Sequence, residues 1–288
     1  MRVMVTGTTG FVGRHVVSEL LACGHSVVGV ARDIKRASEM PWFEDIDFIE
    51  CDLHESFKSL LQEGSLPDVI IHLAWSGLPN YRDFIHVGKN LPGDLAFLEA
   101  AVNSGVPHLV VAGTCLEYGM QDGLLTEDME THPTTVYGFS KDTLRKSLQF
   151  LRNERPYTLQ WMRLFYMYGE GQNKNSLLAQ LDSAIDEGLT EFNMSMGDQL
   201  RDYLPIEEVA KNFSIVINHP NCQGVINCCS GVPISVFDLV QQHCRKRGSD
   251  IKLVRGYYPY PDYEPMTFWG ERSKLDAIAS PEAIASEK

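Results

Sequence analysis

The chain begins with a short apolar segment that leads directly into a glycine-rich turn. Residues 2–5 read Arg-Val-Met-Val, and residues 6–13 read Thr-Gly-Thr-Thr-Gly-Phe-Val-Gly, with glycines at positions 7, 10 and 13. An apolar run of this length is typical of a buried parallel strand. Glycines at this spacing allow a tight turn and let the backbone approach a bound group closely. The segment therefore predicts the first strand of a parallel sheet.

An amphipathic helix and a second strand are predicted to follow the turn. The helix begins near Phe11 and ends at Gly24, and residues 26–30 have the composition of a strand. The apolar face of the helix consists of Val12, Val16, Val17, Leu20 and Leu21. Free backbone N–H groups and the helix dipole favour an anion at the start of such a helix. The unit is therefore a candidate site for the pyrophosphate of a dinucleotide.

Strands and helices continue to alternate along the chain. Further strands are predicted at 48–50, 68–74, 107–113 and 157–165, and helices at 90–104 and 137–152. This alternation indicates an α/β fold of the Rossmann type, with a doubly wound parallel sheet covered by helices on both faces.

The pattern becomes less regular after residue 165, which predicts a second, smaller lobe. We expect residues 1–165 to form a dinucleotide-binding domain, with a strand and a helix returning to it at about 205–230. Residues 166–204 and 231–288 are then a partly discontinuous substrate-binding lobe. Within it, residues 257–269 are rich in proline and aromatic residues, and they either line a pocket or form a packed irregular segment.

Composition limits the classes of function. The chain has 288 residues, of which 44% are hydrophobic, and a formal net charge of −13. This charge argues against a nucleic-acid partner, and no apolar run is long enough to cross a membrane. The first strand starts at residue 2 without a signal peptide, so we expect a cytoplasmic protein. The seven cysteines lack a Cys-x-x-Cys spacing, so we expect no metal site.

A tyrosine and a lysine are placed to act together on one predicted helix. Tyr137 and Lys141 are four residues apart and therefore share a helix face. An ordinary tyrosine has a pKa near 10, and a neighbouring ammonium favours the phenolate and lowers that value. Thr114, at the end of a predicted strand, can hydrogen-bond the same substrate oxygen. The three residues are candidates for proton transfer next to a bound dinucleotide.

These segments together resemble a known family. The turn with glycines at 7, 10 and 13 and the Tyr-x-x-x-Lys pair are similar to those of the extended short-chain dehydrogenase/reductase superfamily. Within that superfamily the resemblance is to the NAD(P)-dependent nucleotide-sugar epimerases, dehydratases and reductases, and it spans residues 1 to about 230. The other matching segments are Asp52-Leu53, His72-Leu73-Ala74, Asn90, Val111 to Thr114, Glu117-Tyr118-Gly119, Pro133, Arg163-Leu164-Phe165 with Tyr168-Gly169, and Arg201-Asp202-Tyr203.

The resemblance implies roles for individual residues. Tyr137 is the expected acid–base residue, Lys141 lowers its pKa and binds the nicotinamide ribose, and Thr114 positions the substrate oxygen. The expected cofactor-binding residues are Gly7, Thr9, Gly10, Phe11, Val12 and Gly13 at the pyrophosphate, Asp52 and Leu53 at the adenine, Leu73 and Ala74 at the ribose, Arg32 and Lys141. The expected substrate-binding residues are Ser76, Thr114, Tyr166, Asn175 and Arg201, the last at the substrate's phosphates.

Differences from the family pattern narrow the range of activities that the chain is expected to have. Dehydratases of the family carry Asp-Glu directly after the Thr, whereas this chain has Cys115 and Leu116, so water elimination is not expected. Fucose-synthase types use a cysteine two positions after the Ser/Thr and a later histidine, which this chain also lacks. Tyr166 stands where many epimerases have an asparagine that contacts the nucleotide sugar.

We therefore interpret the chain as an NAD(P)H-dependent reductase of a nucleotide-linked 4-keto-deoxysugar. Hydride transfer to C4, with Tyr137 as the acid, yields a precursor for a surface polysaccharide or another glycosylated product. One alternative is a nucleotide-sugar 4-epimerase with retained NAD, which uses the same residues. An alternative of another class is a non-catalytic, NADP-binding redox sensor, although a sensor has no need for Thr114, Tyr137 and Lys141.

The end of the second strand predicts the cofactor. NAD-preferring relatives place an Asp there, and we align Ala31 with that position, followed by Arg32. A guanidinium can bind a 2′-phosphate at two points, so we expect NADPH to be preferred, with NAD possible. Lys35 or Arg36 can add positive charge. Asp33 either pairs with Arg32 or, in a longer strand, faces the ribose itself.

The resemblance also predicts a homodimer. The helices at 91–104 and 139–152 are each expected to keep an apolar stripe after they pack on the sheet. In this superfamily such helices pair into a four-helix interface.

Overall fold

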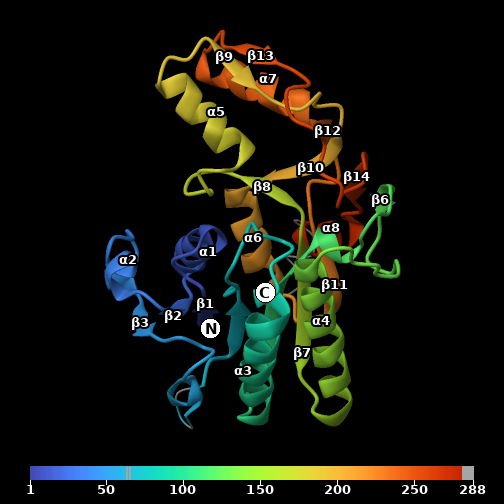
Figure 1. Ribbon diagram of the computed structural model, residues 1–288. Helices are drawn as coiled ribbons and strands as arrows, with labels where there is room; N and C mark the ends of the chain where they lie inside the picture. Colours follow the sequence, from blue (N-terminus) through green and yellow to red (C-terminus); the bar gives the residue numbers. More distant parts are fainter. Residues whose placement is uncertain (63, 65, 281–288) are drawn as a thin grey trace.

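The computed structural model describes residues 1–62, 64 and 66–280. Its largest element is a seven-stranded parallel sheet with strand order β11-β7-β5-β4-β1-β2-β3 (Figure 1). β2 and β3 lie on one side of β1, and the later strands β4, β5, β7 and β11 lie on the other, so that the order reverses between β1 and β4. In such sheets ligands bind beyond the carboxyl ends of the strands at the point of reversal. The strands are β1 (Arg2–Thr6), β2 (Ser26–Ala31), β3 (Asp47–Glu50), β4 (Val69–His72), β5 (His108–Thr114), β7 (Thr158–Leu164) and β11 (Gly224–Cys228).

Helices cover both faces of this sheet. On one face α1 (Phe11–Ala22) packs against α6 (Ile206–Ile217), and on the other α3 (Leu91–Asn103) packs against α4 (Val136–Glu154). Alternate residues of each strand point to opposite faces. Val3 and Val5 accordingly join the core under α1 and α6, whereas Met4 joins the core under α3 and α4. The predicted doubly wound parallel α/β fold is confirmed.

Short helical segments connect the strands at the edges of the sheet. They are α2 (Ile34–Ser38), η1 (Phe43–Asp45), η2 (Lys58–Leu61), η3 (His86–Asn90) and η4 (Cys115–Glu117). η3 directly precedes α3, and η4 directly follows β5. Both lie next to the catalytic candidates described below.

A smaller lobe is built mainly from the second half of the chain. Figure 1 shows α5 (Leu177–Asp186), α7 (Val236–Arg247), β9 (Glu191–Asn193) and β13 (Lys252–Val254) together at one end of the molecule. They enclose their own apolar core, which includes Leu181, Phe192 and Val240. A three-stranded sheet of β8 (Tyr166–Tyr168), β10 (Leu200–Pro205) and β12 (Pro233–Ser235) connects this lobe to the larger one.

The last described elements of the chain return to the larger lobe. β14 (Phe268–Gly270) pairs with β6 (Gly123–Leu125), and α8 (Ser273–Ala279) packs against β11 and α6. The division into residues 1–165 with 205–230, and 166–204 with 231–288, stays a prediction. Within the described ranges, no helix combines the length and the apolar character needed to span a membrane.

Candidate active site

The glycine-rich turn between β1 and α1 is packed too closely for side chains. Gly7 has a φ of +74°, and a Cβ added there lies 2.8 Å from the backbone nitrogen of Ala74. A Cβ on Gly13 lies 2.2 Å from the carbonyl oxygen of Gly7. Gly10 is the N-cap of α1, so the helix starts at the open side of the turn. The turn therefore exposes the free N–H groups of a helix start, as a pyrophosphate site requires.

A cavity of about 570 Å³ lies beside this turn, at the carboxyl ends of β1, β2 and β4. Its size and its position at the reversal of strand order fit a dinucleotide. Its lining includes nine predicted site residues: Gly7, Thr9, Gly10, Arg32, Asp52, Leu53, Leu73, Ala74 and Ser76. The lining does not include Phe11 and Val12, which pack against the core, nor Gly13 and Lys141.

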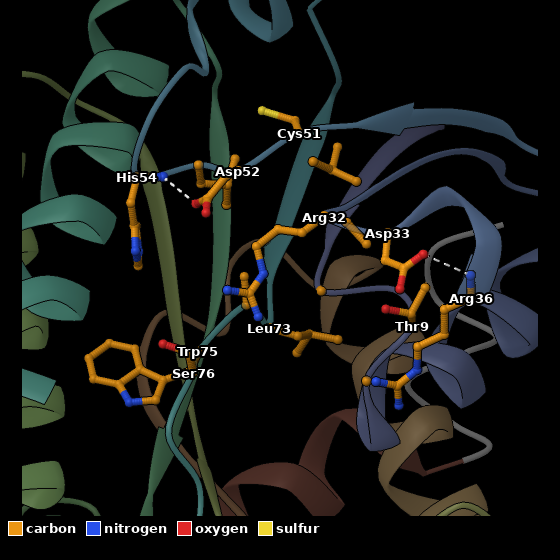
Figure 2. A pocket seen from close by; sticks show the side chains of 16 residues that line it. Thr9, Arg32, Asp33, Arg36, Cys51, Asp52, His54, Leu73, Trp75 and Ser76 are labelled. Atoms are coloured by element: carbon orange, nitrogen blue, oxygen red, sulfur yellow. Dashed lines mark hydrogen bonds between the residues drawn. The ribbon is translucent and has the colours of Figure 1, made fainter. Parts of the chain in front are cut away.

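Two arginines supply positive charge to this cavity. Arg32 and Arg36 both line it. Figure 2 shows the guanidinium group of Arg32, from the β2–α2 connection, on the side of Asp52, and that of Arg36, from α2, on the side of Thr9. β2 ends at Ala31, and Asp33 is the N-cap of α2, where its Oδ1 accepts a hydrogen bond from the Arg36 N–H at 3.0 Å. The Asp33 carboxylate is thus engaged by its own helix.

The three catalytic candidates lie at the junction of β5 and α4. Thr114 is the last residue of β5, and Tyr137 and Lys141 lie in the first two turns of α4. All three side chains are less than a tenth exposed. Burial raises the pKa of Tyr137 far above its ordinary value, whereas a side-chain hydrogen bond with Thr114 lowers it. The structure therefore brings the predicted trio together.

Aromatic rings enclose Tyr137. The ring centroids of Tyr81, His86 and Trp75 lie 5.7, 5.3 and 5.9 Å from that of Tyr137. Tyr81 comes from the loop before η3, and its carbonyl oxygen accepts the backbone N–H of Tyr137 at 3.0 Å. Rings on these sides exclude water from the phenol, which strengthens the electrostatic effect of any charge placed beside it.

The buried Lys141 ammonium lies between a backbone carbonyl and an aromatic ring. Its Nζ donates to the carbonyl oxygen of Ala112 at 2.8 Å and lies 3.9 Å from the ring centroid of Trp75. Burial lowers the pKa of Lys141 to about 8, although the carboxylates of Asp94 and Glu117 act in the opposite direction.

A buried carboxylate braces the end of β5. The Glu117 side chain accepts hydrogen bonds from the Thr114 backbone N–H at 2.9 Å and the Trp161 indole at 2.9 Å, and it pairs with Arg163 at 2.7 Å. From the sequence, Glu117 and Arg163 were recognised only as residues of matching motifs. Their structural role was missed because it depends on the pairing of β5 with β7.

The predicted substrate side contains a second buried ion pair. Arg201, on β10, is 2% exposed and pairs through Nη2 with the Glu264 carboxylate at 3.0 Å. The Tyr166 hydroxyl donates to the other oxygen of Glu264. Glu264 was not predicted, although it lies in the proline- and aromatic-rich segment 257–269. Arg201, expected at a substrate phosphate, is thus engaged by a carboxylate of its own chain.

The remaining predicted substrate residues are dispersed. Ser76 donates from its hydroxyl to Asn90 Oδ1 at 2.7 Å, at the edge of the cofactor cavity. Asn175 is exposed, and its backbone N–H is bonded to Asn173 Oδ1. The structure thus places Asn175 on the surface and not at either ion pair or in the cavity lining.

Comparison with known proteins identifies the family. The family model described as "NAD dependent epimerase/dehydratase family" matches residues 3–229. The chain is 28% identical over 277 residues to dTDP-6-deoxy-L-talose 4-dehydrogenase (NAD(+)) of Aggregatibacter actinomycetemcomitans, covering 94% of this chain and all of that protein. It is 27% identical to UDP-glucose 4-epimerase of Corynebacterium glutamicum, covering 85% of this chain and 80% of that one.

A solved structure agrees with these matches. MoeE5 in complex with UDP-glucuronic acid and NAD superposes with a TM-score of 0.80 at 25% identity, covering 96% of this chain and 92% of that one. The predicted resemblance is confirmed, and with it the prediction of an NAD(P)-dependent enzyme. The chain belongs to the NAD dependent epimerase/dehydratase family.

Proposed function

We propose that the protein reduces the 4-keto group of a nucleotide-linked deoxysugar. The observation that carries the proposal is the Thr114, Tyr137 and Lys141 set, buried at the end of β5 near a cavity that fits a dinucleotide. The similarity to a 4-dehydrogenase of dTDP-6-deoxy-L-talose supports C4 as the reacting carbon.

The chain's own residues supply the proton for this reduction. The bound nicotinamide supplies the hydride. Tyr137 donates its phenolic proton to the C4 oxygen as negative charge develops there, and Thr114 donates a hydrogen bond to the same oxygen. The Lys141 ammonium stabilises the phenolate that remains on Tyr137. The rings of Tyr81 and Trp75 keep water from the reacting groups.

Buried residues after Thr114 argue against water elimination. Cys115 and Leu116 occupy the positions of the acid and base that dehydratases carry, and both are buried in η4. Burial raises the pKa of the Cys115 thiol far above its ordinary value, which favours the neutral thiol at neutral pH. The site therefore supports chemistry at C4 without dehydration.

We propose NADPH as the preferred cofactor of this reaction. Ala31 stands where an acidic residue repels a 2′-phosphate, and Arg32 and Arg36 both line the cavity next to it. Asp33 also lines the cavity, but the N-terminus of α2 already engages its carboxylate. Two guanidinium groups at this position favour the extra phosphate of NADPH.

A 4-epimerase is the second candidate, since the chain is also similar to UDP-glucose 4-epimerase. Two incubations of the purified protein distinguish the two candidates: one with NADPH and a panel of nucleotide-linked 4-keto-6-deoxy sugars, and one with NAD and UDP-glucose. The reductase consumes one equivalent of NADPH for each sugar reduced. Interconversion of UDP-glucose and UDP-galactose without net consumption of cofactor overturns the proposal in favour of the epimerase.

A further inference from the structure

The indole of Trp75 contacts both ionisable catalytic candidates. Its ring centroid lies 3.9 Å from Nζ of Lys141, and its plane makes an edge contact with Tyr137 at 5.9 Å and 65°. Trp75 follows β4 and belongs to the lining of the cofactor cavity, where Figure 2 shows its side chain next to Ser76. One ring therefore forms part of the cavity wall and also faces the buried ammonium.

Hydrogen bonding to His86 sets the orientation of this ring. The Trp75 Nε1–H donates to His86 Nδ1 at 3.0 Å, and the two rings stack at 23°. His86 Nε2 lies 2.9 Å from the carbonyl oxygen of Asn80, which can only accept. The proton of His86 is therefore on Nε2, and Nδ1 is the free acceptor that the indole needs. This tautomer fixes Trp75 with its face toward Lys141.

The ring face compensates Lys141 for the water it has lost. Lys141 is 2% exposed, and its burial favours the neutral amine. Three groups favour the ammonium instead: the negative face of the indole, Asp94 on α3 and Glu117 on η4. Of the ammonium's three N–H donors, one serves Ala112 and one faces the indole, which leaves the third for a hydroxyl of a bound ligand.

We propose that Trp75, oriented by His86, is a positioning residue that keeps Lys141 protonated and directed into the active site. Trp75 acts through Lys141 and takes no part in the proton transfer itself. The inference rests on the proposed role of Lys141 in cofactor binding and in catalysis. It requires no particular sugar, and it can therefore be tested without a sugar substrate.

The test measures NADPH affinity of the full chain by calorimetry from pH 6 to pH 10. In the wild-type protein affinity is expected to fall as the pH rises through about 8, because Lys141 loses its charge. Lys141→Met is expected to abolish this pH dependence, which assigns it to Lys141. In Trp75→Leu the fall in affinity is expected about one pH unit lower, which is a tenfold change in the protonation equilibrium of Lys141, or about 1.4 kcal/mol. Trp75→Phe retains an aromatic ring face, so its affinity should fall at nearly the same pH as that of the wild type.

Fluorinated tryptophan separates the ring's charge distribution from its packing. Mono-, di- and tetrafluorination progressively weaken the negative potential of the ring face with little change in shape. The pH at which NADPH affinity falls should therefore decrease with each step of fluorination. The three other tryptophans are labelled too, and the same series in the Trp75→Phe variant is the control, where no movement is expected.

Three results overturn the inference. The first is a wild-type protein whose NADPH affinity shows no pH dependence that Lys141→Met removes. The second is a Trp75→Leu variant with the same pH dependence as the wild type, and the third is a pH dependence that stays unchanged across the fluorinated series. The fluorinated proteins keep the result decisive even where Trp75→Leu fails to fold. A protein that binds NADPH as expected but reduces no 4-keto sugar refutes the proposed function and leaves this inference standing.

Discussion

The guanidinium of Arg201 and the carboxylate of Glu264 form an ion pair that links β10 to the segment before β14, with less than a tenth of either side chain exposed. Arg201 also lies 4.5 Å from the ring centroid of Phe268. A buried charge that loses its partner costs about 3–5 kcal/mol. This pair is therefore expected to tie the last part of the described chain to the substrate side of the molecule.

Glu264→Leu is accordingly expected to lower the free energy of unfolding by about 3–5 kcal/mol, because it leaves the guanidinium buried and unpaired. Glu264→Gln keeps an acceptor and should cost about 1–3 kcal/mol. The matched control is Asp262→Asn, whose partner Arg82 is exposed, with an expected change below about 1 kcal/mol. Urea denaturation measures all three. Equal stability of Glu264→Leu and Asp262→Asn contradicts the expectation.

Tyr137→Phe is expected to lower turnover about 10²-fold or more while folding and cofactor binding stay intact, because only the transferred proton is removed. Steady-state kinetics with the sugar found in the panel, together with a cofactor titration, measures the effect. Tyr157→Phe is a suitable control, since it also removes a buried hydroxyl, here bonded to the Leu148 carbonyl, but away from the site. Turnover at the wild-type rate in Tyr137→Phe removes this residue from the mechanism.

Arg32→Ala is expected to weaken NADPH binding about 10- to 100-fold and to leave NADH binding nearly unchanged, because charge-assisted hydrogen bonds to the 2′-phosphate are lost. Arg36→Ala should act in the same direction. Lys35→Ala is the control, since Lys35 is exposed and outside the cavity lining. Fluorescence titration of both reduced cofactors gives the ratio. The proposed preference is wrong where wild-type protein binds NADH as tightly as NADPH.

Phe150→Glu is expected to convert a homodimer into a monomer. Phe139 and Phe150 lie on α4, are 50% and 73% exposed, and share one face because eleven residues make about three helical turns. An apolar stripe of this kind fits the four-helix interface predicted for α3 and α4. Light scattering at micromolar concentration reports the mass, with Val232→Glu, 68% exposed near β12, as the control. A monomeric wild-type protein refutes the prediction.

Asp94 is expected to make stability depend on acid pH. Its burial raises the pKa, but His72, His54 and Lys141 outweigh that effect and hold the pKa below the ordinary 3.8. A carboxyl with a depressed pKa stabilises the fold above its unfolded value, and this stability is lost as the pH falls through the lower, folded value. Urea denaturation between pH 7 and pH 2 should show a smaller acid-dependent loss of stability for Asp94→Asn than for wild type, because the loss sets in as the pH falls below about 3.8. Identical slopes count against this assignment.

The amino-acid sequence by itself determined the features that depend on neighbours along the chain. Glycines 7, 10 and 13, between an apolar strand and an amphipathic helix, predict the phosphate turn, because close packing at that turn excludes side chains. Tyr137 and Lys141 share a site because a helix brings residues four apart onto one face. The parallel sheet follows from the alternation of strands and helices.

Only the tertiary structure decided which distant residues surround these groups. Trp75 and His86 reach α4 from the chain between β4 and α3, and Glu264 meets Arg201 across 63 positions of sequence. No local periodicity encodes such contacts, since they depend on how loops from separate strands close over the same edge of the sheet. Burial depends on them too, and it is burial that moves the pKa of Lys141 to about 8. The sequence thus predicts which groups react, whereas the folded chain sets their charge and orientation.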